Sequence, residues 1–142
     1  MEGDRKPYPF IKTAANEDRA KFSPDVGWIA YTSDESGRDE VYVTDFPTPH
    51  AKWRVSTNGG AGPRWRGDGK ELFYIAEDGQ LMAVPINPGK TFEIGTAAAL
   101  FKAGHYDHSV TADGQRFLLN VPRVPDSSPV VVIANWTSML KR

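Results

Sequence analysis

The hydrophobic positions of this chain fall in short runs separated by turns, and no long amphipathic stretch is present. One set of runs has apolar side chains at consecutive positions: 28–31, 72–76 and 117–119. A second set follows after a turn: 41–43, 81–84 and 130–133. More polar runs close two of the units, at 52–56 and 98–101. Short runs without alternation, bounded by Gly, Pro and Asp, indicate β-strands that are covered on both faces.

These runs belong to an internal repeat. The segments 21–31, 64–74 and 109–119 align, and their aspartates, Asp25, Asp68 and Asp113, lie 43 and 45 positions apart. A period of roughly 40 to 45 residues is typical of one blade of a β-propeller. Counting the strand that opens each unit, the pattern predicts about four antiparallel strands per repeat. The best helix candidate, 96–102, is shorter than the roughly 12 residues at which a helix becomes marginally stable alone.

A tight hairpin is predicted at the start of each repeat. Asp68-Gly69 and Asp113-Gly114 suit a two-residue turn, because both residue types tolerate positive φ. The first repeat has Val26-Gly27 instead. A β-branched residue resists positive φ, so we expect another turn geometry there, with Gly27 in the unusual conformation.

The pattern Phe22-Ser23-Pro24-Asp25, followed by the strand at 28–33 and Glu40-Val41-Tyr42-Val43, resembles the WD40-like repeats of TolB-type six-bladed propellers. The longer stretch through 68–74, 113–118 and 135–137 is similar to propeller domains at the C-terminal end of some bacterial serine/threonine kinases. The resemblance extends from about residue 9 to 140. It implies an all-β fold of three four-stranded antiparallel blades, half of a six-bladed β-propeller.

Length and composition are consistent with one domain, 1–142, made of three blade repeats at about 14–57, 58–103 and 104–136. A net charge of -1 argues against nucleic acid as a partner, and no apolar run is long enough for a membrane helix. The absence of cysteine excludes disulfides and a thiol nucleophile. The charged start, 1–6, has no signal-like apolar core after it. As written, the chain is expected to be soluble and cytoplasmic, although TolB-type domains often work outside the cytoplasm.

Three blades do not close a propeller ring, which needs roughly four to eight. Either the chain is a fragment of a longer protein, or two copies associate as a homodimer and complete a six-bladed ring. The segment 8–13 looks like an outermost strand, whereas the third repeat ends after its third strand. We therefore predict that 8–13 of one subunit completes a blade of the partner subunit by strand exchange.

Polar residues that enter the innermost strands are expected to gather at the mouth of the central channel. Together with Asn58, which lies in a connection on the same side, they form the predicted ligand site: Arg19, Lys21, Arg64, His105, Tyr106, Asp107 and His108. The favoured function is a non-catalytic module that binds a protein segment or a small molecule. The alternative is a propeller enzyme of hydrolase or lyase type, with Asp107 and His105 as acid and base.

No cofactor or metal is expected. On a strand, His105 and His108 project to opposite faces, so they do not converge on one ion. The acidic residues at 34, 35, 39 and 40 lack calcium-loop spacing and are interpreted as a solvated hairpin loop. The glycine-rich segment 58–62 lacks the Lys-Ser/Thr of a phosphate loop, and no Gly-x-Ser-x-Gly elbow is present. Four tryptophans are assigned to packing between blades: Trp28, Trp53, Trp65 and Trp136.

Overall fold

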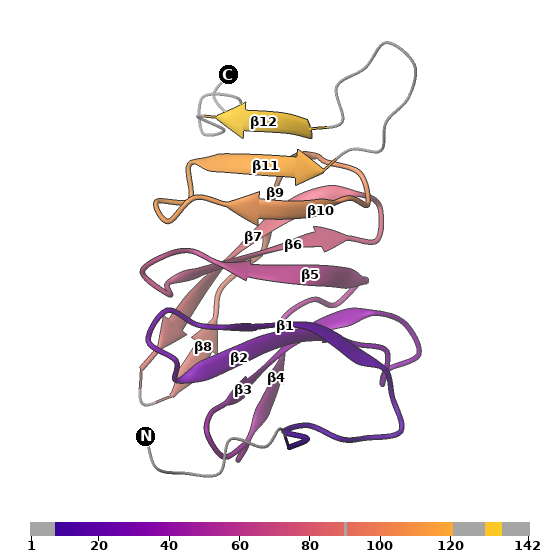
Figure 1. Ribbon diagram of the computed structural model, residues 1–142, viewed down its shortest axis with the longest axis vertical. Helices are drawn as coiled ribbons and strands as arrows, with labels where there is room; N and C mark the ends of the chain where they lie inside the picture. The colour runs from indigo at the N-terminus through magenta and orange to yellow at the C-terminus, as the bar shows by residue number, and fades with distance from the viewer. Residues whose placement is uncertain (1–7, 90, 121–129, 135–142) are drawn as a thin grey trace.

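The computed structural model describes residues 8–89, 91–120 and 130–134, and all regular elements in these ranges are β-strands. They form three antiparallel sheets stacked side by side, which we call blades 1, 2 and 3 (Figure 1). The predicted all-β class is therefore confirmed. In the described part of the chain, no helix is long and apolar enough to cross a bilayer.

Each blade is a meander of strands that follow one another in the sequence. Blade 1 contains β1 (Glu17–Phe22), β2 (Trp28–Ser33), β3 (Glu40–Asp45) and β4 (Lys52–Arg54). Blade 2 contains β5 (Gly60–Trp65), β6 (Glu71–Ala76), β7 (Gln80–Pro88) and β9 (Ala98–Lys102). Blade 3 contains β10 (Asp107–Val110), β11 (Arg116–Asn120) and β12 (Val130–Ala134). The innermost strands β1, β5 and β10 lie in front in Figure 1.

One strand, β8 (Phe92–Ile94), was not expected from the sequence. The long β7 pairs with β9 along its first part and with β8 along its last part. Phe92 of β8 lies with its ring centroid 4.7 Å from both Trp28 and Trp53 of blade 1. The β7–β8 hairpin therefore reaches across to the neighbouring blade, and these two tryptophans have the predicted packing role. Trp136 lies outside the described residues.

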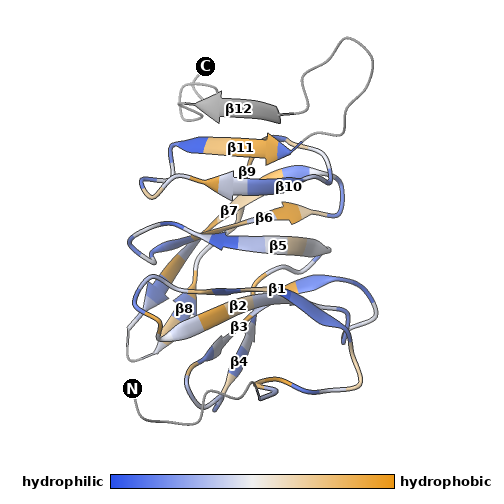
Figure 2. Ribbon diagram, viewed as in Figure 1, coloured by the Kyte–Doolittle hydropathy of each residue, from blue (hydrophilic) through white to orange (hydrophobic). Residues whose placement is uncertain are grey.

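Apolar side chains fill the spaces between the blades. The central strands β2, β6 and β11 contain hydrophobic segments, coloured orange in Figure 2. Between blades 1 and 2, Ala30, Val41 and Val43 pack with Leu72 and Tyr74. The alternate side chains of β6 and β7 point to the other face of blade 2 and pack against β11 of blade 3. This second cluster contains Phe73, Ile75, Leu81, Phe117 and Leu119. Blade 2 is thus covered on both faces, as the runs without alternation predict, and blades 1 and 3 are each covered on the face toward blade 2.

The three opening hairpins share one turn geometry, which differs from the predicted two-residue turn. The amides of Val26, Gly69 and Gly114 donate to the carbonyl three residues earlier, and these three residues have φ of 62°, 73° and 72°. In each turn the preceding aspartate accepts a hydrogen bond from the amide two residues later. This bond fixes the aspartate side chain over the turn. The expectation that Gly27 has the unusual conformation was wrong, since Val26 has it.

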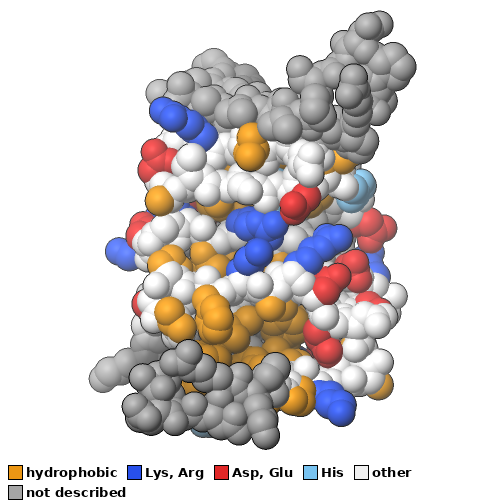
Figure 3. Space-filling view, in the orientation of Figure 1, with side chains coloured by type: hydrophobic (Ala, Val, Ile, Leu, Met, Phe, Trp, Pro, Cys, Tyr) orange, Lys and Arg blue, Asp and Glu red, His pale blue; other side chains and the backbone are white. Residues whose placement is uncertain are grey.

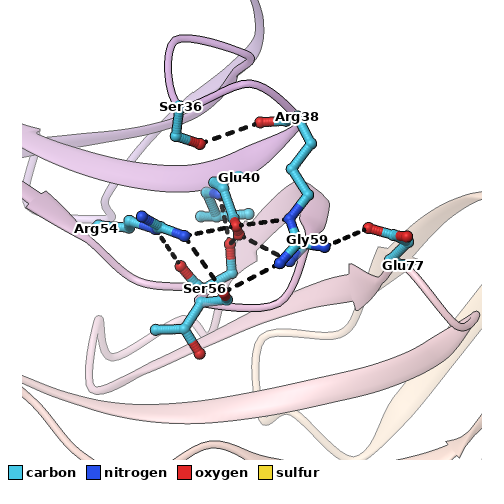
Figure 4. A network of polar contacts seen from close by, with 9 residues as sticks. Ser36, Arg38, Glu40, Arg54, Ser56, Gly59 and Glu77 are labelled. Carbon is cyan, nitrogen blue, oxygen red and sulfur yellow. Dashed lines mark hydrogen bonds and ion pairs between the residues drawn. The ribbon is translucent and has the colours of Figure 1, made fainter.

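Glu40 also corrects a prediction. Its side chain is fully buried, not part of a solvated loop. The carboxylate accepts hydrogen bonds from Ser56 Oγ, from the Gly59 amide at 3.0 Å and from Arg54 at 2.8 Å, with Arg38 Nε 3.4 Å away (Figure 4). Burial is tolerated because every carboxylate oxygen has donors. Glu40 therefore fixes the connection between blades 1 and 2 onto β3.

Residues 8–13 form no strand in the single chain. Phe10 and Ile11 pack against Ile29, Tyr31 and Tyr42, which form the side of blade 1 that points away from blade 2. We call this side the free face of blade 1. The exchange of 8–13 between two copies stays a prediction.

Candidate functional site

The site begins with two matching irregularities in the inner strands. The pairing of β1 with β2 shifts between Asp18 and Lys21, and that of β5 with β6 shifts between Ala61 and Arg64. These shifts fall at equivalent positions of the repeat. Such bulges bend a strand and often lie beside binding sites.

Within the bulges, Arg19 and Gly62 occupy the same place in successive blades. Their φ angles are 56° and 70°, both in the left-handed region. Glycine adopts this conformation freely, whereas a residue with a Cβ pays roughly 1–2 kcal/mol. Blade 1 therefore keeps a charged side chain where the backbone favours glycine, which is the kind of strain found at functional sites.

A cavity of about 360 Å³ opens between the bulges and the start of blade 3. The residues that line it come from several strands and connections: Arg19, Asp39, Ala61, Gly62, Ile75, His105, Tyr106, Asp107 and His108. Five of the eight predicted site residues are among them. A β-carbon on Gly62 would stand 3.4 Å from His108 Cε1 and 3.9 Å from an Arg19 guanidinium nitrogen. The bare backbone of Gly62 thus lies against both polar side chains.

His108 is the deepest polar group of the cavity. Its side chain is almost completely buried, and Nε2 has no hydrogen-bond partner among the described residues. Burial, together with the positive charge of Arg64, lowers the pKa of His108 to about 4, although a hydrogen bond to the Tyr106 backbone opposes the shift. The imidazole is therefore neutral at physiological pH. With the proton on the nitrogen that donates to the backbone, Nε2 is an unused acceptor.

Arg64 lies next to the cavity, and each of its three guanidinium nitrogens donates one hydrogen bond. Nε donates to the His108 carbonyl, one terminal nitrogen to the Pro63 carbonyl and the other to Asp107 Oδ1, each at 2.9 Å. Burial lowers the pKa of this guanidinium. Arg64 therefore joins β5 to β10 and contributes positive charge at the cavity wall, with no donor shown facing a ligand.

Of the other predicted residues, His105 and Asp107 line the cavity, whereas Lys21 and Asn58 lie elsewhere. His105 Nε2 is 2.6 Å from the Glu77 carbonyl, and Asp107 is paired with Arg64, so the proposed acid and base are each held by another group. Lys21 lies on a separate groove over the free face of blade 1. Asn58 lines a third groove beside Arg38.

Sequence reasoning missed Asp39 and Gly62. Gly62 was assigned to a connection between repeats, but it lies in the inner strand β5. Asp39 was assigned to a loop, and it reaches the cavity only through the packing of blades 1 and 2. The repeat alignment, which pairs Arg19 with Gly62, was the available signal. In the described ranges, no group of three His, Asp or Glu side chains is arranged to hold a metal ion.

Comparison with solved structures identifies the architecture. Over 69% of its length, the chain superimposes on an oligogalacturonate lyase from Vibrio parahaemolyticus, with a TM-score of 0.54 and 17% identity. That enzyme is a β-propeller protein. The chain folds as β-propeller blades. The resemblance in fold inferred from the repeats is thereby confirmed.

Two further propeller structures match less well. TolB from Acinetobacter baumannii aligns with 92% of the chain at 18% identity and a TM-score of 0.48. The acylaminoacyl peptidase of Pyrococcus horikoshii aligns with 71% at 17% identity and a TM-score of 0.44. The chain spans 26% of the lyase, 44% of TolB and 17% of the peptidase. No family model and no curated protein matches the chain.

Proposed function

We propose that these propeller blades bind a small hydroxycarboxylate in the cavity between the inner strands, without catalysing a reaction on it. The observation that carries the proposal is the lining of the cavity, where the strained backbone of Arg19 holds its guanidinium close to Gly62, against which the ring of His108 also lies. Guanidinium groups recognise carboxylates by paired, charge-assisted hydrogen bonds. A ligand hydroxyl supplies the donor that a buried neutral imidazole lacks.

The charges around the cavity support an anionic ligand. The positive charge of Arg19 contributes to lowering the pKa of both Arg64 and His108, so the three groups share one region of positive potential. Asp107 already neutralises part of the charge of Arg64 through its ion pair. Within the described part of the chain, the one ion pair of Arg19 is a long 4.0 Å contact with Asp18, and both side chains are mostly exposed. Its guanidinium is the charge available for a carboxylate.

A catalytic function has less support. An acid and a base need to reach the same substrate atoms, whereas His105 is bonded to the Glu77 carbonyl and Asp107 to Arg64. Some proteins with this fold are enzymes, such as the lyase and the peptidase. At the identity observed here, that likeness concerns the fold and not the reaction.

The test uses malate and succinate, which differ only by the hydroxyl group, in calorimetric titrations of the whole chain. Malate should bind about fivefold more tightly than succinate, because the one extra hydrogen bond contributes roughly 1 kcal/mol to the binding free energy. Arg19→Gly should abolish binding of both acids while raising the stability of the fold, because glycine accepts the left-handed conformation. Arg19→Lys, which keeps the strain and the charge, should retain weak binding.

Arg19→Gly and Arg19→Lys together distinguish a loss of ligand binding from a loss of folding. Loss of binding in a variant that is more stable than the parent cannot come from unfolding. His108→Phe should remove the preference for malate and leave succinate binding. Equal affinity of Arg19→Gly and the parent chain, or no binding of either acid at millimolar concentration, would contradict the proposal.

A further inference from the structure

The free face of blade 1 contains an apolar residue at a position that is packed in the other blades. Phe22, at the end of β1, corresponds in the repeat to Trp65 of blade 2 and Val110 of blade 3. Trp65 packs into the cluster between blades 1 and 2, and Val110 into the cluster between blades 2 and 3. Phe22 is instead 53% exposed. The free face therefore has the residue type of a blade-to-blade contact without the neighbouring blade.

Blade 3 has the complementary surface. Leu118 on β11 corresponds to Ala30 of blade 1 and Phe73 of blade 2. Both equivalents are completely buried by the blade that follows them, whereas Leu118 is 43% exposed. Among the described residues neither surface has a neighbouring blade, and the two differ in kind: blade 1 offers the face that receives a preceding blade, and blade 3 the face that receives a following blade.

A groove of about 320 Å³ marks where the preceding blade is missing. It lies over the innermost strand β1 and the central strand β2, and its lining includes Phe22, Ile29, Phe10 and Ile11. Apolar side chains gather over these strands in the space-filling view (Figure 3). Phe10 and Ile11 also border a second groove together with Thr44 and Lys52 of the outer strands. The N-terminal segment therefore lies toward the outer part of the free face and leaves the inner part open.

We propose that blade 3 of a second copy of this chain docks on the free face of blade 1, with Leu118 of that copy over Phe22 and Ile29. Residues 8–13 then lie beside the docked blade where its fourth strand belongs, next to β12, which within the described residues pairs only with β11. The second copy is the occupant favoured by the repeat, because its blade 3 has the surface that blades 1 and 2 use for the same contact. This interaction goes beyond ligand binding and is independent of it.

The contact is head-to-tail, since it joins two different surfaces. Such contacts generate either a closed ring or an open chain of copies. Two copies supply six blades, within the range of closed propellers, and each copy then uses both of its surfaces. We therefore expect a closed dimer with two identical contacts and no larger assembly.

The experiment measures mass in solution by sedimentation equilibrium for the whole chain and three variants. The parent should be a dimer at micromolar concentration. Phe22→Lys and Leu118→Asp should each weaken self-association by about 30-fold or more, as for a central interface residue. Phe22 packs edge-on against Phe46 but is 53% exposed, and Leu118 is 43% exposed, so neither change should unfold the single chain. Ala98→Lys, at an exposed position of β9 in blade 2, is the matched control and should remain a dimer.

Mixing the two interface variants gives the sharpest result. In a closed ring of one Phe22→Lys copy and one Leu118→Asp copy, one contact pairs lysine with aspartate and the other is unchanged. The mixture should therefore recover a dimer that neither variant forms alone. A parent chain that stays monomeric at 100 µM, as expected if further blades of a longer polypeptide cover these faces, would overturn the proposal. Dimers that persist in both variants, or a mixture that stays monomeric, would also overturn it.

Discussion

Val26 has the same backbone conformation as Gly69, with φ of 62° and 73°, although one residue is β-branched and the other has no side chain. Both amides donate to the carbonyl three residues earlier, and both residues follow an aspartate whose side chain accepts from the next amide but one. The turn is thus imposed by the repeat, and blade 1 adopts it with an unfavourable residue.

Replacing Val26 with glycine should therefore stabilise the chain. Relief of the left-handed strain contributes roughly 1–2 kcal/mol, and the greater freedom of glycine in the unfolded state removes roughly 0.5–1 kcal/mol. We expect the free energy of unfolding in urea to rise by about 1 kcal/mol. Gly27→Ala is the control: Gly27 lies outside the left-handed region, and a β-carbon there meets Asp25 Oδ1 at an ordinary 3.4 Å. A larger loss from Gly27→Ala than gain from Val26→Gly would show that the strain lies at Gly27.

Glu40→Gln should strongly destabilise the fold. The change leaves the guanidinium groups of Arg38 and Arg54 without their buried carboxylate and places an amide group against one of these donors. Loss of one partner from a buried charge network typically costs about 3 kcal/mol or more. Glu77→Gln removes an exposed carboxylate paired with the same Arg38 and should change stability by less than about 0.5 kcal/mol. Similar urea midpoints for the two variants would mean that burial of Glu40 carries no special weight.

The arrangement of strands could be predicted because it depends on local sequence. Apolar runs, repeat period and turn residues all identify the same strands, so the central strands β2, β6 and β11 were found. β8 was missed because blade 1 has no equivalent strand in the repeat, and Phe92 is understood only from its packing between two tryptophans of another blade.

The predictions about Val26, Glu40 and the site show the limit of local reasoning. In the first turn, Asp25 stabilises the loop, and Val26 takes a positive φ although β-branched residues avoid it. Residue propensities alone do not indicate this outcome. Glu40 is buried because donors from β4 and the next connection surround it, and these are 14 to 19 residues away. His105 to His108 were placed in the site from sequence, whereas Asp39 joins them only through the packing of two blades.

Arg64→Lys should loosen blade 3 from blade 2. Lysine cannot reproduce the three directed bonds that the guanidinium makes to Pro63, His108 and Asp107, because its ammonium is a single point on a flexible chain. We expect a loss of about 2 kcal/mol in unfolding free energy and faster amide exchange in β10. Arg66→Lys affects ion pairs within one hairpin and should leave exchange in β10 unchanged. Equal exchange rates in the two variants would argue against Arg64 as the link between the blades.

The burial of neutral His108 should make stability depend on pH in a defined window. Its pKa falls from 6.5 to about 4 on folding, so below pH 6.5 the unfolded chain binds a proton that the folded chain does not. The contribution of neutral His108 to the free energy of unfolding is therefore fully present above pH 6.5. It declines toward pH 4, by about 3 kcal/mol in total.

The charged groups near the imidazole are Arg64, Arg19 and Asp107. The turn aspartates with lowered pKa values, such as Asp68 at about 2, titrate below this window. His108→Asn removes the titrating group, so the difference in unfolding free energy between parent and variant should shrink steadily from pH 7 to pH 4. Urea unfolding at half-unit intervals measures it. A constant difference across that range would mean that His108 is protonated as easily in the folded chain as in the unfolded one, and that the cavity does not exclude its charge.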